Sequence, residues 1–268
     1  MSVKVKYLME HAGECSRLEM KTRAEQVLRQ ASWAGIGEGM HVLDAGCGVG
    51  KTSSILKELV GDSGSITGVD LSTERLQEAT RRYGRDGVRF VRHDLTQPFQ
   101  PQQQYDAVWM RFLLEYFADD PLNIVRNAAA TLKPGGIMVL ADLESNSLNH
   151  HGLSERLRRT IEDVIGCLGR FGNFDPFAGG KLYGHLYDLG FRDIEITTEA
   201  HHLIYGQISV ADRANWLSKL EVAAKSSGST FAEYNGDFSA LRKEFLEFLD
   251  DPRRFIFTPI IICRGIKP

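Results

Sequence analysis

Cysteine, long apolar runs and excess charge of one sign are all scarce in this chain of 268 residues. The four cysteines show no CxxC or other metal-ligand spacing, so we expect reduced thiols, no metal site and a cytoplasmic location. The longest apolar run, FIFTPIIIC, contains Pro259 and is far too short to span a bilayer. The first residues, MSVKVKYLMEHAG, are too short and too polar a stretch for a signal peptide.

Charge is nearly balanced, with 32 basic and 35 acidic residues and a formal net charge of −3. Binding to nucleic acid needs clustered basic residues, so this balance argues against nucleic acid as the main partner. The hydrophobic share of 43% and the charged share of 25% are typical of a soluble globular protein. The length suits one large α/β domain or two small ones.

The stretch HVLDAGCGVG, residues 41–50, organises the chain. A short apolar strand leads into Asp44, a glycine-rich loop follows, and residues 51–60 are predicted to form a helix. A strand, a tight glycine turn and a helix N-terminus together form a seat for a nucleotide-like ligand. The glycines of the loop are Gly46, Gly48 and Gly50.

Short apolar strands alternate with helical segments up to residue 143. This alternation predicts the α/β class, with a mostly parallel sheet covered by helices on both faces. Ligands bind at the carboxyl ends of the strands in such sheets. Charged side chains fall at five of these ends: Asp44, Asp70, Asp94, Arg111 and Asp142.

Beyond residue 143 the alternation loosens, and nothing marks a separate domain. We expect a single domain over residues 1–268, with helical segments lying over the active edge of the sheet. A capping box at Ser16 and Glu19 predicts the start of the first helix. The core of the sheet is expected over residues 35–143, 177–199 and 255–268, and the helical segments over 1–34, 144–176 and 200–254.

Three kinds of ligand fit the glycine loop. The sequence AGCGVGKT, residues 45–52, matches a relaxed P-loop, and Asp142 would then be a second ligand for Mg²⁺. The GxGxG spacing also fits a nicotinamide or flavin site, with Asp70 about 20 residues beyond the glycines. However, a P-loop needs no acid before its glycines, and the third glycine of a dinucleotide site would fall at Ser53. Both interpretations are therefore less favoured than a third.

The third interpretation accounts for five segments in order. VLDAGCGVG, ITGVDLS, FVRHDLT, YDAVWMRFLLEYF and LKPGGIMVLAD follow one another between residues 41 and 143. This stretch resembles the class I S-adenosylmethionine (SAM) dependent methyltransferases. WMRFLLEYF and DPFAGGKLYGHLYDLGF are most similar to the small-molecule enzymes related to ubiquinone- and menaquinone-biosynthesis methyltransferases.

The resemblance implies a Rossmann-like, seven-stranded sheet in the order 3-2-1-4-5-7-6, with the last strand antiparallel. In that order the last strand is internal. Pro259 cannot donate a hydrogen bond to a neighbouring strand, so we expect either that the strand begins after Pro259 or that there is a bulge.

The resemblance also implies SAM as cofactor and S-adenosylhomocysteine (SAH) as product. Glycines without a Cβ would let the backbone approach the amino-acid arm of SAM, and the helix N-terminus would favour its carboxylate. Asp70 would accept hydrogen bonds from both ribose hydroxyls, and Asp94 would accept one from the adenine amine. The implied cofactor site consists of Asp44, Gly46, Cys47, Gly48, Gly50, Thr52, Asp70, Leu71, Asp94, Leu95 and Arg111.

Methyl transfer is an in-line displacement, and much of its acceleration can come from placing the nucleophile correctly. A general base is needed only if the nucleophile must lose a proton. No catalytic residue is therefore certain. Arg111 could bind an acidic group of the substrate or pair with Glu115, four residues further on. The candidate catalytic residues are His150, His151, Glu115 and Arg111, with the pair His201 and His202 as weaker candidates.

The acceptor is expected to be a small molecule, and a homodimer is left open. Five aromatic residues could wall an apolar or aromatic pocket for it, although core packing is the default role of each: Tyr7, Trp109, Phe171, Phe174 and Tyr183. The alternative from another functional class is a SAM-binding protein that transfers no methyl group, such as a sensor or a partner subunit.

Overall fold

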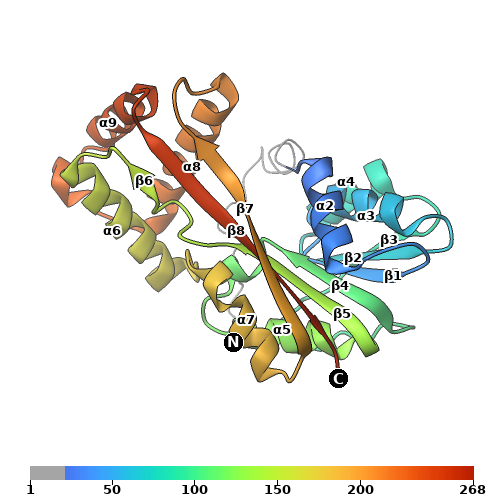
Figure 1. Ribbon diagram of the computed structural model, residues 1–268. Helices are drawn as coiled ribbons and strands as arrows, with labels where there is room; N and C mark the ends of the chain where they lie inside the picture. Colours follow the sequence, from blue (N-terminus) through green and yellow to red (C-terminus); the bar gives the residue numbers. More distant parts are fainter. Residues whose placement is uncertain (1–21) are drawn as a thin grey trace.

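The structure, a computed structural model, describes residues 22–268. The capping box predicted at Ser16 and Glu19, and the predicted pocket residue Tyr7, lie outside the described residues. Within the described part of the chain, eight strands join in one sheet (Figure 1). They are β1 (His41–Ala45), β2 (Ser65–Asp70), β3 (Val88–Arg92), β4 (Tyr105–Arg111), β5 (Leu132–Leu143), β6 (His150–His151), β7 (Arg192–Ile204) and β8 (Phe255–Ile266).

The strand order is β3-β2-β1-β4-β5-β8-β6, and β7 also pairs with β8. Strands β1 to β5 pair in parallel, whereas β8 runs antiparallel to β5, β6 and β7. The predicted sixth and seventh strands are β7 and β8, so the predicted mostly parallel sheet with an antiparallel last strand is confirmed. The additional strand, β6, has two residues and pairs with β8 beyond the end of β5.

Strand β8 runs through Pro259, so it does not begin after this residue. Instead the register of β7 against β8 shifts between Ala200 and His202, next to the pairing of Ala200 with Pro259. The shift inserts one extra residue, His201, into β7. This is a bulge, which was one of the two alternatives expected from Pro259. Because a bulge interrupts the alternation of side chains, the rings of His201 and His202 lie only 4.3 Å apart.

Helices cover both faces of the sheet (Figure 1). One apolar layer packs α2 and α3 against β1, β4 and β5, and the other packs α5 and α7 against the opposite face. Helix α4 packs beside α3 and along β3. The bounds of these helices are α2 (Ala24–Ala34), α3 (Lys51–Val60), α4 (Thr73–Tyr83), α5 (Pro121–Ala130) and α7 (Ala178–Asp188).

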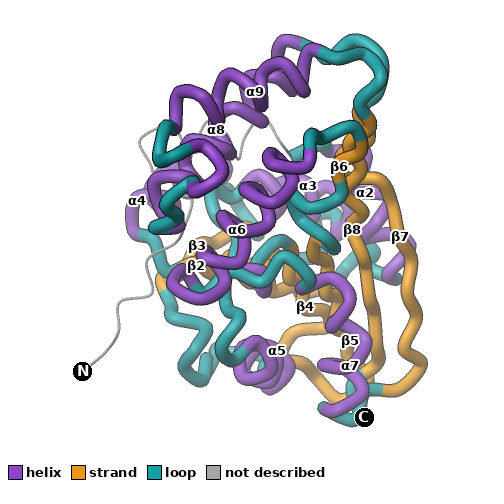
Figure 2. The backbone as a smooth tube through the Cα atoms, turned by 90° about the vertical axis from the view of Figure 1, so that its left-hand side faces the viewer, coloured by secondary structure: helices purple, strands orange, loops and turns teal. Residues whose placement is uncertain are grey.

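A third apolar cluster lies outside these layers, in a group of helices that we call the helical cap. Figures 1 and 2 show α8 and α9 at one end of the long strands β7 and β8, with α6 beside them. The buried centre of the cap includes Leu157, Trp216 and Leu241. The cap consists of α6 (Glu155–Gly172), α8 (Val210–Ser227), the 3-10 turn η2 (Ala232–Tyr234) and α9 (Phe238–Asp250).

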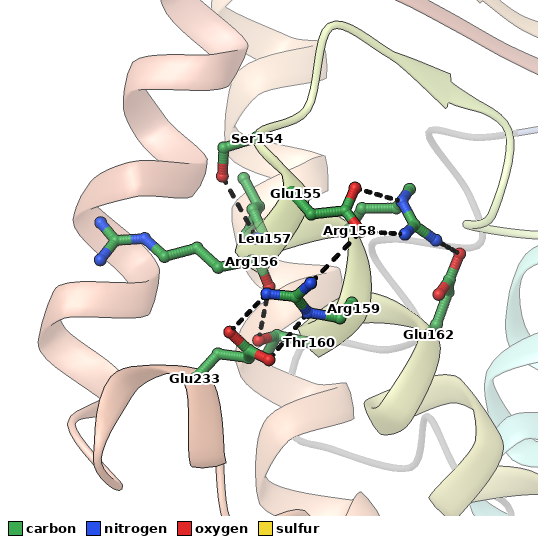
Figure 3. A network of polar contacts seen from close by, with 9 residues as sticks. All are labelled: Ser154, Glu155, Arg156, Leu157, Arg158, Arg159, Thr160, Glu162 and Glu233. Atoms are coloured by element: carbon green, nitrogen blue, oxygen red, sulfur yellow. Dashed lines mark hydrogen bonds and ion pairs between the residues drawn. The ribbon is translucent and has the colours of Figure 1, made fainter.

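Polar contacts hold the outer side of the cap together (Figure 3). The Ser154 hydroxyl accepts a hydrogen bond from the Leu157 amide at 3.2 Å and so caps α6. Further along α6, Arg159 pairs with Glu233 of η2 at 2.8 Å. The charged side of α6 therefore faces outward, which leaves its apolar side for the interior of the cap. None of the helices that the structure describes is both long enough and apolar enough to cross a membrane.

Candidate active site

The carboxyl ends of the strands meet at one edge of the sheet, between the sheet and the helical cap. A cleft of about 1750 Å³, counted to its open mouth, lies along this edge. The glycine loop, the ends of β1, β2 and β4, and the inner sides of α6 and α8 all line it. Of the predicted cofactor residues, Asp44, Gly46, Cys47, Gly48, Thr52, Asp70, Leu71, Asp94, Leu95 and Arg111 line the cleft.

The glycine loop runs along the cleft in a backbone conformation that suits glycine. Gly46, Gly48 and Gly50 all have positive φ angles, of 82°, 54° and 81°. Gly50 does not itself line the cleft but begins α3, and a Cβ there would lie 2.6 Å from the ring of Phe90. Gly50 therefore lets α3 pack closely against the sheet, which directs the N-terminus of α3 and Thr52 toward the cleft.

Asp70 ends β2 and is almost fully buried. Its Oδ2 accepts a hydrogen bond from the Gly48 amide at 3.0 Å, which connects the end of β2 to the glycine loop. Its Oδ1 accepts from the Ser72 amide at 2.9 Å and from Nη2 of Arg75 at 2.8 Å. These donors hold the carboxylate in one orientation, with Oδ2 as the less occupied of its two oxygens.

Asp44 is the penultimate residue of β1 and is buried, with 3% of its surface exposed. Its Oδ2 accepts a hydrogen bond from the Ser53 hydroxyl at 2.6 Å. The pKa of Asp44 is raised to about 7, mainly by burial and to a smaller extent by the charge of nearby Asp70. The hydrogen bond from Ser53 and the charge of Arg111 act in the opposite direction. Asp44 therefore connects β1 to the first turn of α3.

Asp94 and Leu95 follow β3 at the far end of the cleft. The Oδ1 of Asp94 accepts hydrogen bonds from the amide and the hydroxyl of Thr96, at 3.0 and 2.7 Å. Its Oδ2 makes no hydrogen bond to a described residue, so one acceptor oxygen remains open to a ligand. The half-exposed side chain of Leu71 lines the same part of the cleft.

Arg111 ends β4 and lies with its guanidinium 4.0 Å from the centre of the Phe112 ring. Burial lowers the pKa of Arg111 to about 10, although Asp142, Asp44 and Glu199 favour its charged form. Arg111 and Glu115 do not form the ion pair that was one of the two roles considered for Arg111. That prediction assumed helical spacing, but Arg111 ends a strand and Glu115 lies in the 3-10 turn η1 (Leu114–Tyr116).

Asp142 and Glu115 form a buried acidic pair behind and beside the cleft. Asp142 accepts hydrogen bonds from the amides of Leu114 and Leu143, at 2.8 and 2.9 Å, and does not line the cleft. Burial raises the pKa of Asp142 well above its usual range, and the charge of Glu115 adds to the shift. Glu115 lines the cleft and accepts a hydrogen bond from Nδ2 of Asn146 at 2.7 Å.

The two histidines of β6 point to different environments. His150 lines a smaller cavity in the cap, with its ring 4.9 Å from that of Trp216. Burial, together with the nearby charge of Lys219, lowers the pKa of His150 to about 4. His151 is exposed and lines neither cavity, which follows from the alternation of side chains along a strand. His201, displaced by the bulge in β7, does line the main cleft.

The aromatic candidates for the acceptor pocket lie in different places, and core packing was the default role of each. Phe174 lines the cleft, as predicted. Trp109 is fully buried in the core, because β4 is a central strand with helices on both of its faces. Phe171 is 76% exposed near the end of α6, and Tyr183 stacks on Tyr187 at the surface of α7.

Several residues that line the cleft escaped prediction. Arg75 had a detectable signal, since it lies in the first turn of the helix that follows Asp70. Asn146 and Ser147 lie in an irregular loop, and Lys219 and Ala223 lie on α8, where neither spacing nor motif distinguishes them from surface residues. In the described part of the chain, no group of three or more His, Cys, Asp or Glu side chains is arranged to hold a metal ion.

A parallel sheet with a glycine loop at its active edge and acids at successive strand ends defines a Rossmann-like, nucleoside-binding type of protein. Residues 42–136 match the family described as methyltransferase domain, and this is the part of the chain that carries the resemblance. The resemblance to class I SAM-dependent methyltransferases is thereby confirmed.

Individual relatives agree with this assignment. The chain is 32% identical over 143 residues to an arsenite methyltransferase of Aquipseudomonas alcaligenes, covering 49% of this chain and 40% of the relative. It is also 32% identical over 113 residues to a ubiquinone biosynthesis O-methyltransferase of Coxiella burnetii, covering 41% and 46%. The matches thus span less than half the length of these relatives.

A solved structure shows the same fold over more of the chain. Phosphoethanolamine N-methyltransferase 2 of Haemonchus contortus, in complex with SAM, aligns with a TM-score of 0.54 and 20% identity. The alignment covers 91% of this chain and 52% of that one. At this level of identity the likeness establishes the fold alone.

Proposed function

We propose that this protein binds SAM and transfers its methyl group to a small-molecule acceptor by in-line displacement. The observation that supports this most is the convergence of Asp70, Asp94 and the glycine loop on one cleft. Bound SAM would supply a methyl group on sulfur: the bond from this carbon to the acceptor forms while the S–CH₃ bond breaks, and the sulfur keeps the electron pair in SAH. The relatives named as methyltransferases support the same reaction.

The residues present fit the three parts of SAM. The N-terminus of α3, with Thr52 at the cleft, suits the carboxylate of the amino-acid arm. The Oδ2 of Asp70, which has a single hydrogen bond from Gly48, can accept from the ribose diol. The open Oδ2 of Asp94 can accept from the adenine amine, with Leu71 and Leu95 against the base.

Asp44 has a different proposed role. Its carboxyl group is bound to Ser53 and nearly enclosed, so it orients the glycine loop and the start of α3 rather than holding the ligand. If the acceptor must lose a proton, Glu115 and His201 are candidate bases among the titratable groups that line the cleft. His151 is exposed and does not line the cleft, so it is not a candidate for that base.

The geometry also weighs against the P-loop alternative. A P-loop enzyme would need Asp142 at the phosphate and Mg²⁺ position. Here Asp142 accepts hydrogen bonds from backbone amides and does not line the cleft. The alternative that remains is a protein that binds SAM without transferring methyl. A single-domain organisation, a homodimer and a cytoplasmic location stay predictions.

Calorimetry with SAM, SAH, ATP·Mg and NAD tests the cofactor part of the proposal. We expect micromolar binding of SAM and SAH alone. Asp70→Ala should weaken SAH binding by about 1–3 kcal/mol, because it removes charge-assisted hydrogen bonds to the ribose. Asp62→Ala, which changes an exposed aspartate in the turn after α3, is the matched control and should leave the affinity unchanged. Binding of ATP·Mg without SAM would contradict the proposal.

Release of SAH from SAM in the presence of a panel of small molecules tests the transfer. Turnover with any acceptor would exclude the non-catalytic alternative. Tight SAH binding together with no SAH release across a chemically broad panel would favour that alternative instead.

A further inference from the structure

Three consecutive residues at the end of β4 line the main cleft: Arg111, Phe112 and Leu113. Successive side chains of a regular strand point to opposite sides, so an extended chain would not place all three there. Phe112 has a positive φ of 55°, and its amide donates a hydrogen bond to the carbonyl of Ala141 at 2.9 Å. Residues other than glycine rarely adopt this conformation, and here it directs the chain along the wall of the cleft.

The guanidinium of Arg111 has no acceptor among the described residues. Its Nε is buried without a hydrogen bond, and neither of its Nη groups donates to a described residue or forms an ion pair with one. Donors of this kind are normally paired in folded proteins. The side chain remains partly exposed and lines the cleft, so its Nη groups are open to a ligand.

Three acids lie near enough to favour the charged form of Arg111, but each has other donors. These donors are backbone amides for Asp142, the Ser53 hydroxyl for Asp44, and the side chains of Arg29 and Gln30 for Glu199. Glu115, which also lines the cleft, accepts a hydrogen bond from Asn146. The acids therefore help to keep Arg111 charged without occupying its donors.

Arg111 lies on the side of the cleft away from the proposed ribose and adenine sites. In the sheet, β4 neighbours β1 on the side opposite β2 and β3, whose ends precede or carry Asp94 and Asp70. The guanidinium lies 4.0 Å from the centre of the Phe112 ring, and that ring lies 4.9 Å from the ring of His201 on β7. The cation is therefore next to the part of the cleft that β4 and β7 line.

An apolar and aromatic wall adjoins this cation. The segment after β4, helix α6 and the turn that follows α6 supply it, and the rings of Tyr116 and Phe174 lie 6.0 Å apart. An apolar surface beside Arg111 lowers the local dielectric, which strengthens the attraction between its charge and an anion. The wall consists of Phe112, Leu113, Tyr116, Phe117, Ile165 and Phe174.

We propose that the methyl acceptor has a carboxylate that pairs with the guanidinium of Arg111 and an apolar or aromatic body that lies against this wall. A guanidinium presents neighbouring N–H donors that match the two oxygens of a carboxylate. The inference rests on the methyl transfer proposed above, since it assigns the acceptor of the same cleft. A cationic amine would be repelled by Arg111 at this position.

Pairs of small molecules that differ in charge test the proposal on the SAH-bound protein. The pairs are benzoate with benzamide, 2-naphthoate with 2-naphthamide, and octanoate with octanamide, and calorimetry gives their dissociation constants. For at least one pair we expect the wild type to bind the acid about tenfold or more tightly than its amide, because the acid forms a charge-assisted pair. Arg111→Gln should remove this preference, whereas Arg111→Lys should keep part of it.

Two further variants serve as controls. Arg126→Gln removes an exposed arginine of α5 that does not line the cleft, so the preference should stay as in the wild type. Phe174→Ala removes a ring from the wall and should weaken the acid and the amide of a pair by the same factor. Thermal unfolding shows which variants keep the fold, and the wild-type comparison tests the proposal without any variant.

A second measurement distinguishes the acceptor from the cofactor as the source of the carboxylate. SAH carries a carboxylate on its amino-acid arm, and 5′-methylthioadenosine lacks this arm. If Arg111 pairs with the acceptor, Arg111→Gln changes the affinities for SAH and for 5′-methylthioadenosine by the same factor. Selective weakening of SAH would mean that Arg111 holds the cofactor, which overturns the proposal.

Two other results would also overturn it: no preference for the acid in any pair, or an unaltered preference in Arg111→Gln. Either result, with SAH binding intact in the wild type, contradicts the acceptor assignment alone. A wild type that does not bind SAH contradicts the proposed methyltransferase function instead.

Discussion

The edge of the sheet and the helical cap face each other across one cleft, yet they place their charges in opposite ways. At the sheet edge, acidic side chains lie inside, and backbone amides and neighbouring side chains satisfy them, as Gly48, Ser72 and Arg75 do for Asp70. In the cap, charged side chains lie outside in exposed pairs, and the inner surface is apolar (Figure 3).

This difference indicates that the two regions have different functions. Buried charges need several partners in defined positions, so the sheet edge accepts one ligand geometry. An apolar cavity needs mainly a matching shape and volume, so the cap can change its occupant through a few substitutions. The sheet edge, with its fixed polar geometry, is proposed to hold the cofactor, which leaves the cap side of the cleft for the acceptor.

The largest expected effect tests the rigidity of the sheet edge. Gly50→Ala forces an alanine into a left-handed conformation and places its Cβ 2.6 Å from the Phe90 ring. We expect a loss of about 2–5 kcal/mol in the free energy of unfolding, from backbone strain together with overpacking. Urea denaturation followed by circular dichroism measures this loss.

Gly190→Ala is the matched control. Gly190 has a similar φ of 77°, but no atom lies within 4 Å of the position its Cβ would take. Its substitution should cost about 1–2 kcal/mol from backbone strain alone. If both variants lose the same free energy of unfolding, close packing behind the glycine loop contributes nothing to stability. That result would weaken the contrast with the cap.

One titrating group in each region makes stability depend on pH, and the two dependences have opposite signs. Between about pH 4 and 7 the folded protein retains a proton on Asp44 that the unfolded chain releases, because burial raises the pKa of Asp44 from 3.8 to about 7. This group therefore makes stability fall as pH rises. His150 does the reverse: its pKa falls from 6.5 to about 4 on folding, so the unfolded chain binds the extra proton and stability rises with pH over that window.

Asp44→Asn should thus make the slope of unfolding free energy against pH more positive, and His150→Gln should make it less positive. Each change is at most about 1.4 kcal/mol per pH unit, the value for one proton. Urea denaturation of the three proteins at several pH values between 4.5 and 7.5 measures both slopes. Slopes that move in the same direction would contradict the assigned environment of one of the two groups.

The two regions also differ in how far their sequence predicted them. The sheet edge was predictable because acids lie at or next to the ends of β1 and β2, beside a glycine loop. The strand order followed from the resemblance, and the bulge opposite Pro259 was one of the two alternatives that the missing N–H of proline left open. Trp109 has the core role that was its default, because β4 is buried on both faces.

The cavity of the cap could not be predicted from the sequence, for a physical reason. Its cavity is formed by side chains from three helices that are far apart in sequence, so no local spacing records it. Lys219 lies on α8 among residues of mixed polarity, and its position beside the cleft depends on the packing of α8 against α6. Asn146 likewise reaches the cleft through tertiary contacts rather than through a motif.

The smallest expected effect concerns the outer side of the cap. Arg159 and Glu233 join α6 to η2 at 2.8 Å, but their side chains are 49% and 34% exposed. A double-mutant cycle with Arg159→Gln and Glu233→Gln should therefore give a coupling energy of about 0–1 kcal/mol, and less at high salt. A coupling energy well above that range would mean that the cap depends on defined polar geometry as much as the sheet edge does. In that case the cap could not exchange its occupant as freely as its apolar interior suggests, because substitutions on the inner side of α6 would disturb the pairs on its outer side.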